Sequence, residues 1–368
     1  MTSERRTLRV IEPNLAGPSG HYAEWVRAVA ARRGGLFGRI EVDASARSAG
    51  MPPLAPDVEL RPTFHGASRT AEWAAMRRAL GAGGPFVVLT ANAFHAAALE
   101  AIALLDRRPD RALRDARLYF HWREQAPARR LAAAMAPRTR RNALAIAPTA
   151  SIAAFLRETG WARVHEVPYP ALAPAEVPPA RARCTHLLVA GAARMNKGLP
   201  IIADLAERLG RAKDPMRLVV QTTPKRASGR RGRQEEAELA RLMASGAPGL
   251  EASDTAPPSD AYGARFDGAL TLAPYDPGTF ADAVSGIVLD ALLRGSPCVA
   301  TAGTWPGRLV ERFGAGATFR AGSADAFADA VSGVLADWPA VAARAQAAAR
   351  TLAQEHDPAH LVRVLAEG

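Results

Sequence analysis

Cysteine and long hydrophobic runs are scarce in this chain. Only two of its 368 residues are cysteines, Cys184 and Cys298, and each lies beside or within an apolar, strand-like run. We therefore expect two buried thiols, not a disulfide or a metal site, as in proteins of a reducing cytoplasm. No apolar run approaches the roughly 18 residues that cross a membrane, and the N-terminal segment lacks the apolar core of a secretory signal. These absences predict a cytoplasmic protein.

Lysine and aromatic residues are scarce as well. Three lysines are present among 47 basic residues, so the formal net charge of +11 comes mostly from arginine. Abundant alanine and arginine are typical of a GC-rich genome, but the excess charge equally favours phosphate-bearing partners such as sugar nucleotides or anionic lipid head groups. Nucleic acid is not expected, because the arginines are scattered and aromatic residues make up only 6%. The one dense basic run, 224–236, is predicted to be a solvated surface loop.

The length and the alternation of patterns predict two α/β domains. A chain of 368 residues is more than twice the usual domain size. Short apolar runs alternate with helical segments, which is typical of a doubly wound parallel sheet. The expected strands include 8–12, 85–90, 116–121, 143–147, 185–191, 218–221, 269–273 and 298–301.

A proline-rich segment, 167–179, separates the two series of strands and helices. Its prolines exclude both a helix interior and a central strand. We therefore expect an N-terminal domain at 1–170, a linker at 171–180 and a second domain at 181–345. The remaining segment, 346–368, is helical and either completes the second domain or returns to the first.

Polar residues follow two of the expected strands of the first domain. Ligands of open α/β sheets bind beyond the carboxyl ends of the strands. After the first strand, Gly17 and Gly20 form a turn, and His21 and Tyr22 begin a helix. This turn suits a ligand phosphate or is simply tight, and it does not match the dinucleotide fingerprint.

Two histidines lie after expected strands of the same domain. His121 ends the strand at 116–121, where its ring either contacts a substrate hydroxyl or phosphate or has a structural role. His95 has a similar position, but its alanine-rich neighbours offer no evident partner, which makes a functional role less expected.

The second domain offers cations on one loop and carboxylates on another. A buried run ends at Gly191 and is followed by Arg194 and Lys197, which suit a diphosphate but are also typical of exposed loop cations. Farther on, Asp282 and Asp290 flank the Ser285-Gly286 pair at an expected helix start, where free amides and the helix dipole attract phosphate. Asp282 also suits a solvated face or a cap, whereas a carboxylate inside the apolar run around Asp290 is costly unless paired.

These motifs resemble the donor domain of retaining glycosyltransferases of the GT-B fold, particularly family 4. That family has an Arg and a Lys-Gly on one loop, two Glu with seven residues between them, an Ala, and a later Gly-x-Pro. The matching residues here are Arg194, Lys197-Gly198, Asp282, Asp290-Ala291 and Gly295-Ser-Pro297. The resemblance covers about 187–316 well and the N-terminal half only in its rhythm of elements and its loops. It implies two Rossmann-like domains that face each other across a cleft.

The resemblance also implies a role for each candidate residue. The expected catalytic residues are those that stabilise the leaving diphosphate or contact the transferred sugar, namely Arg194, Lys197, Asp282 and His121. The expected donor-binding residues are those that hold the ribose or present glycine turns and amides, namely Asp290, Gly191, Ser285, Gly286, Gly17 and Gly20. His21 and Tyr22 are expected to bind the acceptor.

The implied activity is retaining transfer of a hexose from a UDP- or GDP-sugar to a glycan, lipid-linked or small-molecule acceptor. No cofactor and no metal are expected, and the setting would be polysaccharide biosynthesis in a bacterium. Any membrane contact would be peripheral, on anionic lipid of the inner face, through the arginine-rich stretch 129–141.

Two departures from the family pattern leave alternatives open. Both family Glu positions are Asp here, and the usual Phe-Gly is Val284-Ser285. The neighbouring Asp276 is an alternative acid to Asp282. The chain is alternatively a degenerate, non-catalytic binding protein of the same fold, or a sugar-nucleotide epimerase on the same scaffold.

Overall fold

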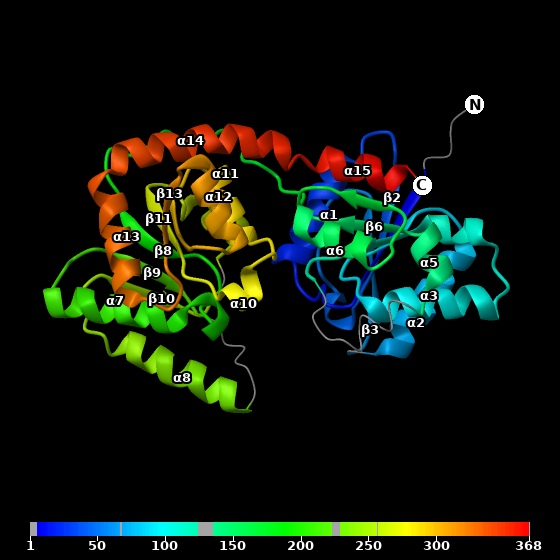
Figure 1. The fold of residues 1–368 in the computed structure, drawn as a ribbon, viewed down its shortest axis with the longest axis horizontal. Coiled ribbons are helices and arrows are strands. Elements are labelled where there is room, and N and C mark those ends of the chain that lie inside the picture. The colour runs from blue at the N-terminus through cyan, green and yellow to red at the C-terminus, as the bar shows by residue number, and fades with distance from the viewer. Residues whose placement is uncertain (1–5, 67, 124–134, 223–228, 256, 368) are drawn as a thin grey trace. The chain divides into compact units, whose positions relative to one another are not determined.

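The computed structural model describes residues 6–66, 68–123, 135–222, 229–255 and 257–367. The chain forms two compact units, shown in Figure 1. The first comprises Met1–Leu172 together with His356–Gly368, and the second comprises Ala173–Glu355. The chain therefore passes from one unit to the other twice.

The first unit is built on a parallel sheet of seven strands in the order β3-β2-β1-β4-β5-β6-β7. The strands are β1 Thr7–Glu12, β2 Arg39–Ser45, β3 Val58–Phe64, β4 Phe86–Val88, β5 Ala116–Tyr119, β6 Leu144–Ala147 and β7 Val164–Glu166. The α-helices described are α1 His21–Arg32, α2 Arg69–Ala82, α3 Ala93–Leu105, α5 Pro137–Asn142, α6 Ala150–Glu158 and α15 Pro358–Ala366.

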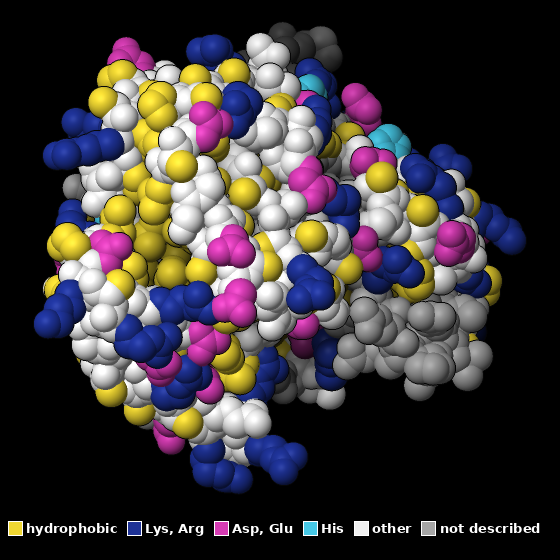
Figure 2. Space-filling model, turned by 60° about the vertical axis from the view of Figure 1, so that its left-hand side comes forward, with side chains coloured by type: hydrophobic (Ala, Val, Ile, Leu, Met, Phe, Trp, Pro, Cys, Tyr) yellow, Lys and Arg dark blue, Asp and Glu magenta, His cyan; other side chains and the backbone are white. Residues whose placement is uncertain are grey.

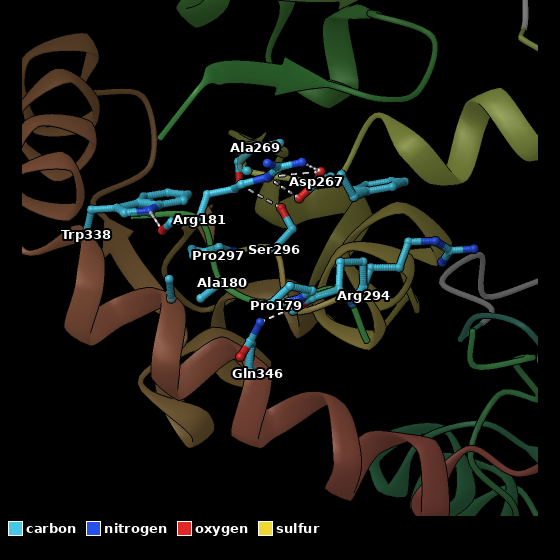
Figure 3. A pocket seen from close by; sticks show the side chains of 15 residues that line it. Pro179, Ala180, Arg181, Asp267, Ala269, Arg294, Ser296, Pro297, Trp338 and Gln346 are labelled. Carbon is cyan, nitrogen blue, oxygen red and sulfur yellow. Dashed lines mark hydrogen bonds and ion pairs between the residues drawn. The ribbon is translucent and has the colours of Figure 1, made fainter. Parts of the chain in front are cut away.

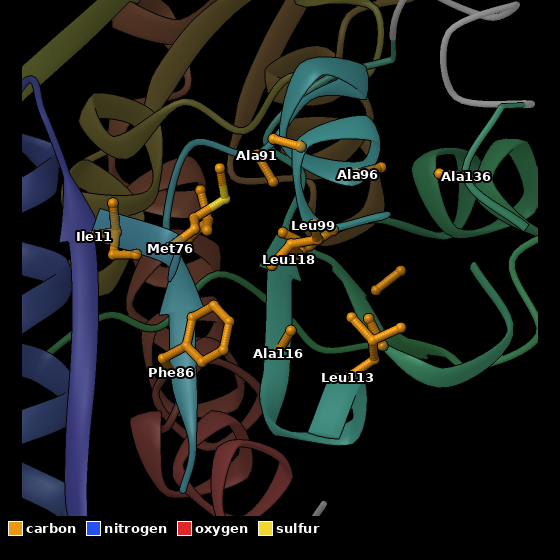
Figure 4. Close-up of a cluster of buried hydrophobic side chains, with 14 of the residues drawn as sticks. Ile11, Met76, Phe86, Ala91, Ala96, Leu99, Leu113, Ala116, Leu118 and Ala136 are labelled. Carbon is orange, nitrogen blue, oxygen red and sulfur yellow. The ribbon is translucent and has the colours of Figure 1, made fainter. Parts of the chain in front are cut away.

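One face of this sheet is covered by α2 and α3. Figure 4 shows the resulting core, in which Ile11, Phe86 and Leu118 of three adjacent strands meet Met76 of α2 and Leu99 of α3. These side chains are all fully buried. The burial of so many apolar groups supplies the main driving force for folding of this unit.

The last helix, α15, packs against α1 of the first unit. An ion pair joins Arg32 of α1 to Asp357, and the amide of Ala171 donates to the carbonyl of His356. The C-terminal segment therefore completes the first unit.

The second unit has a parallel sheet of six strands in the order β10-β9-β8-β11-β12-β13. The strands are β8 His186–Val189, β9 Leu218–Gln221, β10 Leu250–Ser253, β11 Ala269–Ala273, β12 Cys298–Thr301 and β13 Gly316–Phe319. The α-helices described are α7 Leu199–Ala212, α8 Gly229–Met243, α9 Ser259–Ala264, α10 Pro277–Phe280, α11 Gly286–Leu293, α12 Trp305–Phe313, α13 Ala324–Ala336 and α14 Trp338–Glu355.

The expected fold class of two doubly wound parallel-sheet domains is confirmed. The first strand of each sheet is central, and its two neighbours are the second and the fourth strand. The direction of winding therefore reverses between β1 and β4 and again between β8 and β11. Such a switch point is where open α/β sheets bind ligands.

The prediction of a surface loop at 224–236 is wrong for its described part. Residues 229–236 are the beginning of α8, and the rest of the run lies outside the described residues. The helix forms because the basic residues lead directly into the strong helix formers of EEAELARLM. Glu235 is buried and accepts a hydrogen bond from the amide of Met195, which docks the helix.

Basic side chains are interspersed with acidic ones over the face that Figure 2 shows. The arginine-rich stretch expected to contact a membrane lies partly outside the described residues, at 129–134. In its described part, Arg138 is paired with Asp110 and Arg140 donates to the carbonyl of Thr159. No helix in the described ranges combines the length and the apolar character that crossing a membrane requires.

Candidate functional site

The loop after β8 is locked to the loop after β11. The amide of Asp276 donates to the carbonyl of Asn196 over 3.0 Å. Gly198 has φ +75°, and a Cβ at this position would lie 2.0 Å from the carbonyl oxygen of Pro274. Only glycine fits both the backbone angle and the close approach. The two loops at the switch point of the second unit therefore form one rigid surface.

Lys197 stands on this surface with its amine beside the start of α11. A Cβ at Gly191 would lie 3.1 Å from Lys197 Nζ and 3.0 Å from Cγ1 of Ile287, so the missing side chain leaves space for both. The amine also lies 5.8 Å from the centre of the Tyr275 ring. Burial, and then the nearby Arg194 cation, lower the pKa of Lys197 to about 8. A bound anion would stabilise the charged amine.

The N-terminus of helix α11 forms the next part of this surface. Ser285 is buried and caps the helix, its Oγ accepting from the amide of Val288 over 3.3 Å. No atom lies within 4 Å of where a Cβ on Gly286 would be. Uncapped amides next to open space, at the positive end of a helix dipole, can bind an anion.

Asp290, on the second turn of α11, is held by two side chains. Its Oδ2 accepts from the hydroxyl of Tyr262 over 2.9 Å, and its Oδ1 lies 3.4 Å from Arg294. Burial, and then this carboxylate, raise the pKa of Tyr262 well above its ordinary value. These contacts explain how an acid is tolerated inside an apolar run. The side chain of Asp290 is 32% exposed, so a ligand hydroxyl can reach the carboxylate.

Asp282 precedes α11 on a loop that α12 holds. Arg308 of α12 donates to the carbonyls of Ala281, over 2.6 Å, and Gly303, over 3.0 Å. Asp282 itself is half-buried. Asp276, the alternative acid, accepts from both the amide and the hydroxyl of Thr279 and so caps α10. The structure thus gives Asp276 a structural role.

The glycine turn of the first unit precedes α1. Gly20 has φ +95°, and nothing lies within 4 Å of a Cβ at either Gly17 or Gly20. Helix α1 begins at His21 without a side-chain cap. His21 is exposed and Tyr22 half-buried, and the carbonyl of His21 accepts from the hydroxyl of Tyr169 over 2.9 Å. The turn thus leaves room beside the first amides of α1.

His121 follows β5 in a group of aromatic rings. Its ring centre lies 4.8 Å from that of Tyr119, 5.8 Å from Trp122, 6.0 Å from His21 and 6.1 Å from Tyr169. Its Nε2 is buried and has no hydrogen-bond partner within the described ranges. Burial, and then the neighbouring His21, lower the pKa of His121 to about 3, so the ring is neutral at physiological pH.

Sequence reasoning missed Glu12 at the end of β1. Its side chain is fully buried beside the switch point of the first sheet. Oε1 accepts from the amide of Asn14 over 2.8 Å, whereas Oε2 finds no hydrogen-bond partner in the part of the chain that the structure describes. Burial raises the pKa of Glu12 to about 7. The signal was an acid that ends the apolar run LRVI.

His95 has a partner that its neighbours in sequence do not reveal. Its Nε2 lies 2.7 Å from Oε2 of Glu72, which comes from α2. Its Nδ1 accepts from the amide of Asn92 over 3.0 Å, and Asn92 in turn caps α3. His95 is therefore a buried capping residue.

A pocket of the second unit lies at the N-terminal ends of the strands, at the edge of the sheet opposite to the switch point. Figure 3 shows residues that precede β8, β11 and β12 together with side chains of α14. Trp338 donates from Nε1 to the carbonyl of Arg181 over 2.9 Å, Arg181 pairs with Asp267, and Gln346 donates to the carbonyl of Pro178. These bonds attach the proline-rich segment to α14. The residues of the pocket thus hold the proline-rich segment in place, and they lie away from the switch point.

The described residues contain no group of three or more His, Cys, Asp or Glu side chains placed to hold a metal ion. Both cysteines are free thiols, Cys298 buried and Cys184 partly so.

No protein-family model matches this sequence, and neither does any curated protein. Solved structures resemble it over nearly their whole length. Alr3699/HepE of Anabaena with UDP-glucose is 14% identical with a TM-score of 0.69, the alignment covering 98% of both chains. WaaG, a glycosyltransferase involved in lipopolysaccharide biosynthesis, is 15% identical with a TM-score of 0.67, covering 98% of this chain and 100% of WaaG.

Sucrose-phosphate synthase of Thermosynechococcus elongatus is 14% identical with a TM-score of 0.63, covering 98% of this chain and 96% of the synthase. At these identities the similarity establishes the fold alone. The two Rossmann-like domains are those of the GT-B fold.

Proposed function

We propose that this protein is a glycosyltransferase that uses a nucleotide-diphosphate sugar, with UDP-sugars as the first candidates. The main support is the surface formed by Lys197, Gly191 and the open start of α11, where a half-buried cation and free amides converge. Alr3699/HepE, which shares the fold, is described in complex with UDP and with UDP-glucose.

In this proposal the second unit binds the donor. Lys197, Arg194 and the dipole of α11 neutralise the diphosphate, and Asp290 accepts hydrogen bonds from the ribose hydroxyls. Gly286 lets the donor approach the backbone, Gly191 makes room for the Lys197 amine, and Ser285 caps the helix whose N-terminus meets the diphosphate. Because protein cations stabilise the leaving group, the proposal assigns no metal and no cofactor to the reaction.

The chemical step we propose is transfer of a hexose with retention. The bond between the anomeric carbon and the diphosphate oxygen breaks, and the acceptor oxygen forms its bond on the same face. The acceptor proton passes to the departing diphosphate. Asp282 and the neutral ring of His121 would contact the transferred sugar, and the charge that develops on the leaving oxygen is stabilised by Lys197 and Arg194.

The first unit would bind the acceptor at the start of α1, through His21 and Tyr22, with Gly17 and Gly20 giving a donor or acceptor phosphate access to the amides. A glycan or lipid-linked acceptor in bacterial polysaccharide biosynthesis is the class we propose. It is supported by WaaG, which shares the fold and is described as involved in lipopolysaccharide biosynthesis. With a lipid-linked acceptor, the enzyme would act at the cytoplasmic surface of the membrane.

The test is release of nucleotide by the purified protein from a panel of UDP-, GDP- and dTDP-sugars. One donor should be hydrolysed slowly, and both Lys197→Ala and Asp290→Asn should abolish release without a change in melting temperature. Lys213→Asn is the matched control, because Lys213 is an exposed lysine at the end of α7 in a left-handed conformation that asparagine tolerates. No release from any donor, with no thermal shift by any nucleotide, would refute the proposal.

A second candidate is a binding protein of this fold without catalysis. It is favoured by aspartate at positions 282 and 290, where the family that the sequence resembles has glutamate, because the shorter side chain at 282 reaches less far toward a bound sugar. In that case a nucleotide should raise the melting temperature, while no donor is hydrolysed and no acceptor is glycosylated.

A further inference from the structure

Trp122 is the exposed member of the aromatic group around His121. All six tryptophans lie in the described residues, and Trp122, whose surface is 45% exposed, is the most exposed of them. Trp25, Trp161 and Trp338 are almost completely buried. A large indole left in water beyond the end of a strand is a surface that can gain free energy from a ligand.

The indole lies between two residues that contact the rest of the first unit. Its ring is tilted by 33° to that of His121 at 5.8 Å. The next residue, Arg123, lies over the ring of Phe155 on α6, 5.6 Å from its centre. The residues on both sides of Trp122 therefore contact the rest of the first unit, which restricts the positions that the indole can take and lowers the cost of binding a ligand to it.

The surroundings of the platform combine apolar ring faces with hydrogen-bonding groups. The exposed His21 has its ring centre 6.0 Å from that of His121, and the half-buried Tyr22 lies beside His21 at 3.8 Å, tilted by 45°. Tyr119 and Tyr169 are buried and pack against His121. The buried Nε2 of His121 has no hydrogen-bond partner in the described ranges. A ligand with one apolar face and hydroxyls at its edge matches this combination, and a sugar ring has both.

We propose that Trp122 is the stacking platform of a carbohydrate subsite in the first unit, and that the acceptor is consequently a sugar whose apolar ring face covers the indole. The identity of this sugar as acceptor rests on the proposed function. The subsite itself requires only that a sugar ring bind at Trp122.

The direct test is ¹⁹F NMR of the full chain labelled with 5-fluorotryptophan. Trp122→Phe identifies the resonance of residue 122, and the resonance of the buried Trp338 is the internal control. Titration with a panel of methyl glycosides, maltose and cellobiose should shift the Trp122 resonance with at least one sugar and leave that of Trp338 in place. A Trp122 resonance that no sugar moves would overturn the proposal.

Two further probes separate a sugar from other ligands. UDP alone should leave the Trp122 resonance unchanged, because the proposed nucleotide site lies in the second unit. Phosphatidylglycerol vesicles should also leave it unchanged. A shift with vesicles and none with sugars would make Trp122 a membrane contact and refute the carbohydrate subsite.

Kinetics connect the subsite to the reaction. Trp122→Ala should raise the acceptor KM by about tenfold, the loss expected for one aromatic stacking contact, while donor hydrolysis stays at the wild-type rate. Leu105→Ala, at a residue that is 72% exposed, is the control for loss of surface apolar area. If the wild type hydrolyses no donor, the proposed function fails, whereas the NMR titration still decides the subsite.

Discussion

The two units share the order of their first six strands, to which the first unit adds β7, but they differ in how the polar groups at their switch points are hydrogen-bonded. In the second unit most of these groups have partners: Asp290 accepts from Tyr262 and pairs with Arg294, and Asp276 and Ser285 cap helices. One amide oxygen, Oδ1 of Asn196, is buried there without a partner among the described residues. In the first unit Glu12 and His121 each bury an atom that lacks a partner among the described residues. The acids of the second switch point are largely held by the chain itself, whereas the first switch point leaves hydrogen-bonding capacity on two titratable side chains, which a ligand or water can satisfy.

The rigidity of the second switch point is tested most severely at Gly198. Gly198→Ala should lower the free energy of unfolding by about 3 kcal/mol or more and abolish nucleotide binding, because the new Cβ collides with the Pro274 carbonyl at an unfavourable φ. Thermal unfolding and nucleotide titration measure the two effects. The control Gly333→Ala, in an open helical position of α13, should stabilise the protein slightly. A tolerated Gly198→Ala would mean that the two loops are not locked.

The buried acid of the first switch point is tested by pH. Folding raises the pKa of Glu12 from 4.5 to about 7, so its contribution to stability is complete below pH 4.5 and is lost as the pH rises through 7. The loss amounts to about 3 kcal/mol. Glu12→Gln should remove this part of the dependence in urea unfolding between pH 5 and 8, whereas the exposed Glu24→Gln should retain it. Identical profiles for Glu12→Gln and the wild type would show that the carboxyl is not buried uncharged.

The cation of the second switch point is also tested by pH. Because the pKa of Lys197 is about 8 in the free protein, nucleotide affinity should fall by about tenfold for each pH unit well above 8. Lys197→Arg, which stays charged, should bind with little change up to pH 9. Calorimetric titration with UDP checks both. A wild-type affinity that is flat to pH 9 would remove Lys197 from the diphosphate site.

The smallest expected effect concerns the loop that carries Asp282. Arg308→Ala should slow donor hydrolysis by about threefold to tenfold, since two charge-assisted hydrogen bonds to loop carbonyls are lost. The rate of donor hydrolysis by Arg308→Lys should lie between those of the wild type and Arg308→Ala. Lysine keeps the positive charge but lacks the several N–H donors of the guanidinium group. Arg320→Ala, an exposed arginine after β13, should match the wild type. Equal rates for Arg308→Ala and the wild type would show that the loop with Asp282 keeps its conformation without the hydrogen bonds from Arg308.

Much of the fold could be predicted because it depends on local pattern. The strands β9, β11 and β12 have the bounds that the apolar runs predict, at 218–221, 269–273 and 298–301. By contrast, β10 and β13 were missed, because an edge strand such as LEAS or GATF is half-exposed and carries little apolar signal. Their existence depends on hydrogen bonds to a neighbouring strand.

The sequence allowed us to predict which residues are candidates for the site, but not which side chains they contact. Spacing indicated Lys197 and Asp290, yet the partner of Asp290 is Tyr262, from a helix 28 residues earlier, and the partner of His95 is Glu72, 23 residues earlier. Contacts of this kind are set by packing between elements, which periodicity does not describe. Glu12 was missed for the same reason, since its burial depends on strands that flank β1.

The return of α15 to α1 makes the second unit an insertion. In chain order, the first unit is interrupted after Leu172 and resumes at His356, so the entire second unit lies inside it. A fragment ending at residue 172 would lack the helix that covers α1, whereas residues 173–355 form a continuous segment. The second unit can therefore be exchanged as one continuous segment, with one joint inside the proline-rich segment and the other just before α15.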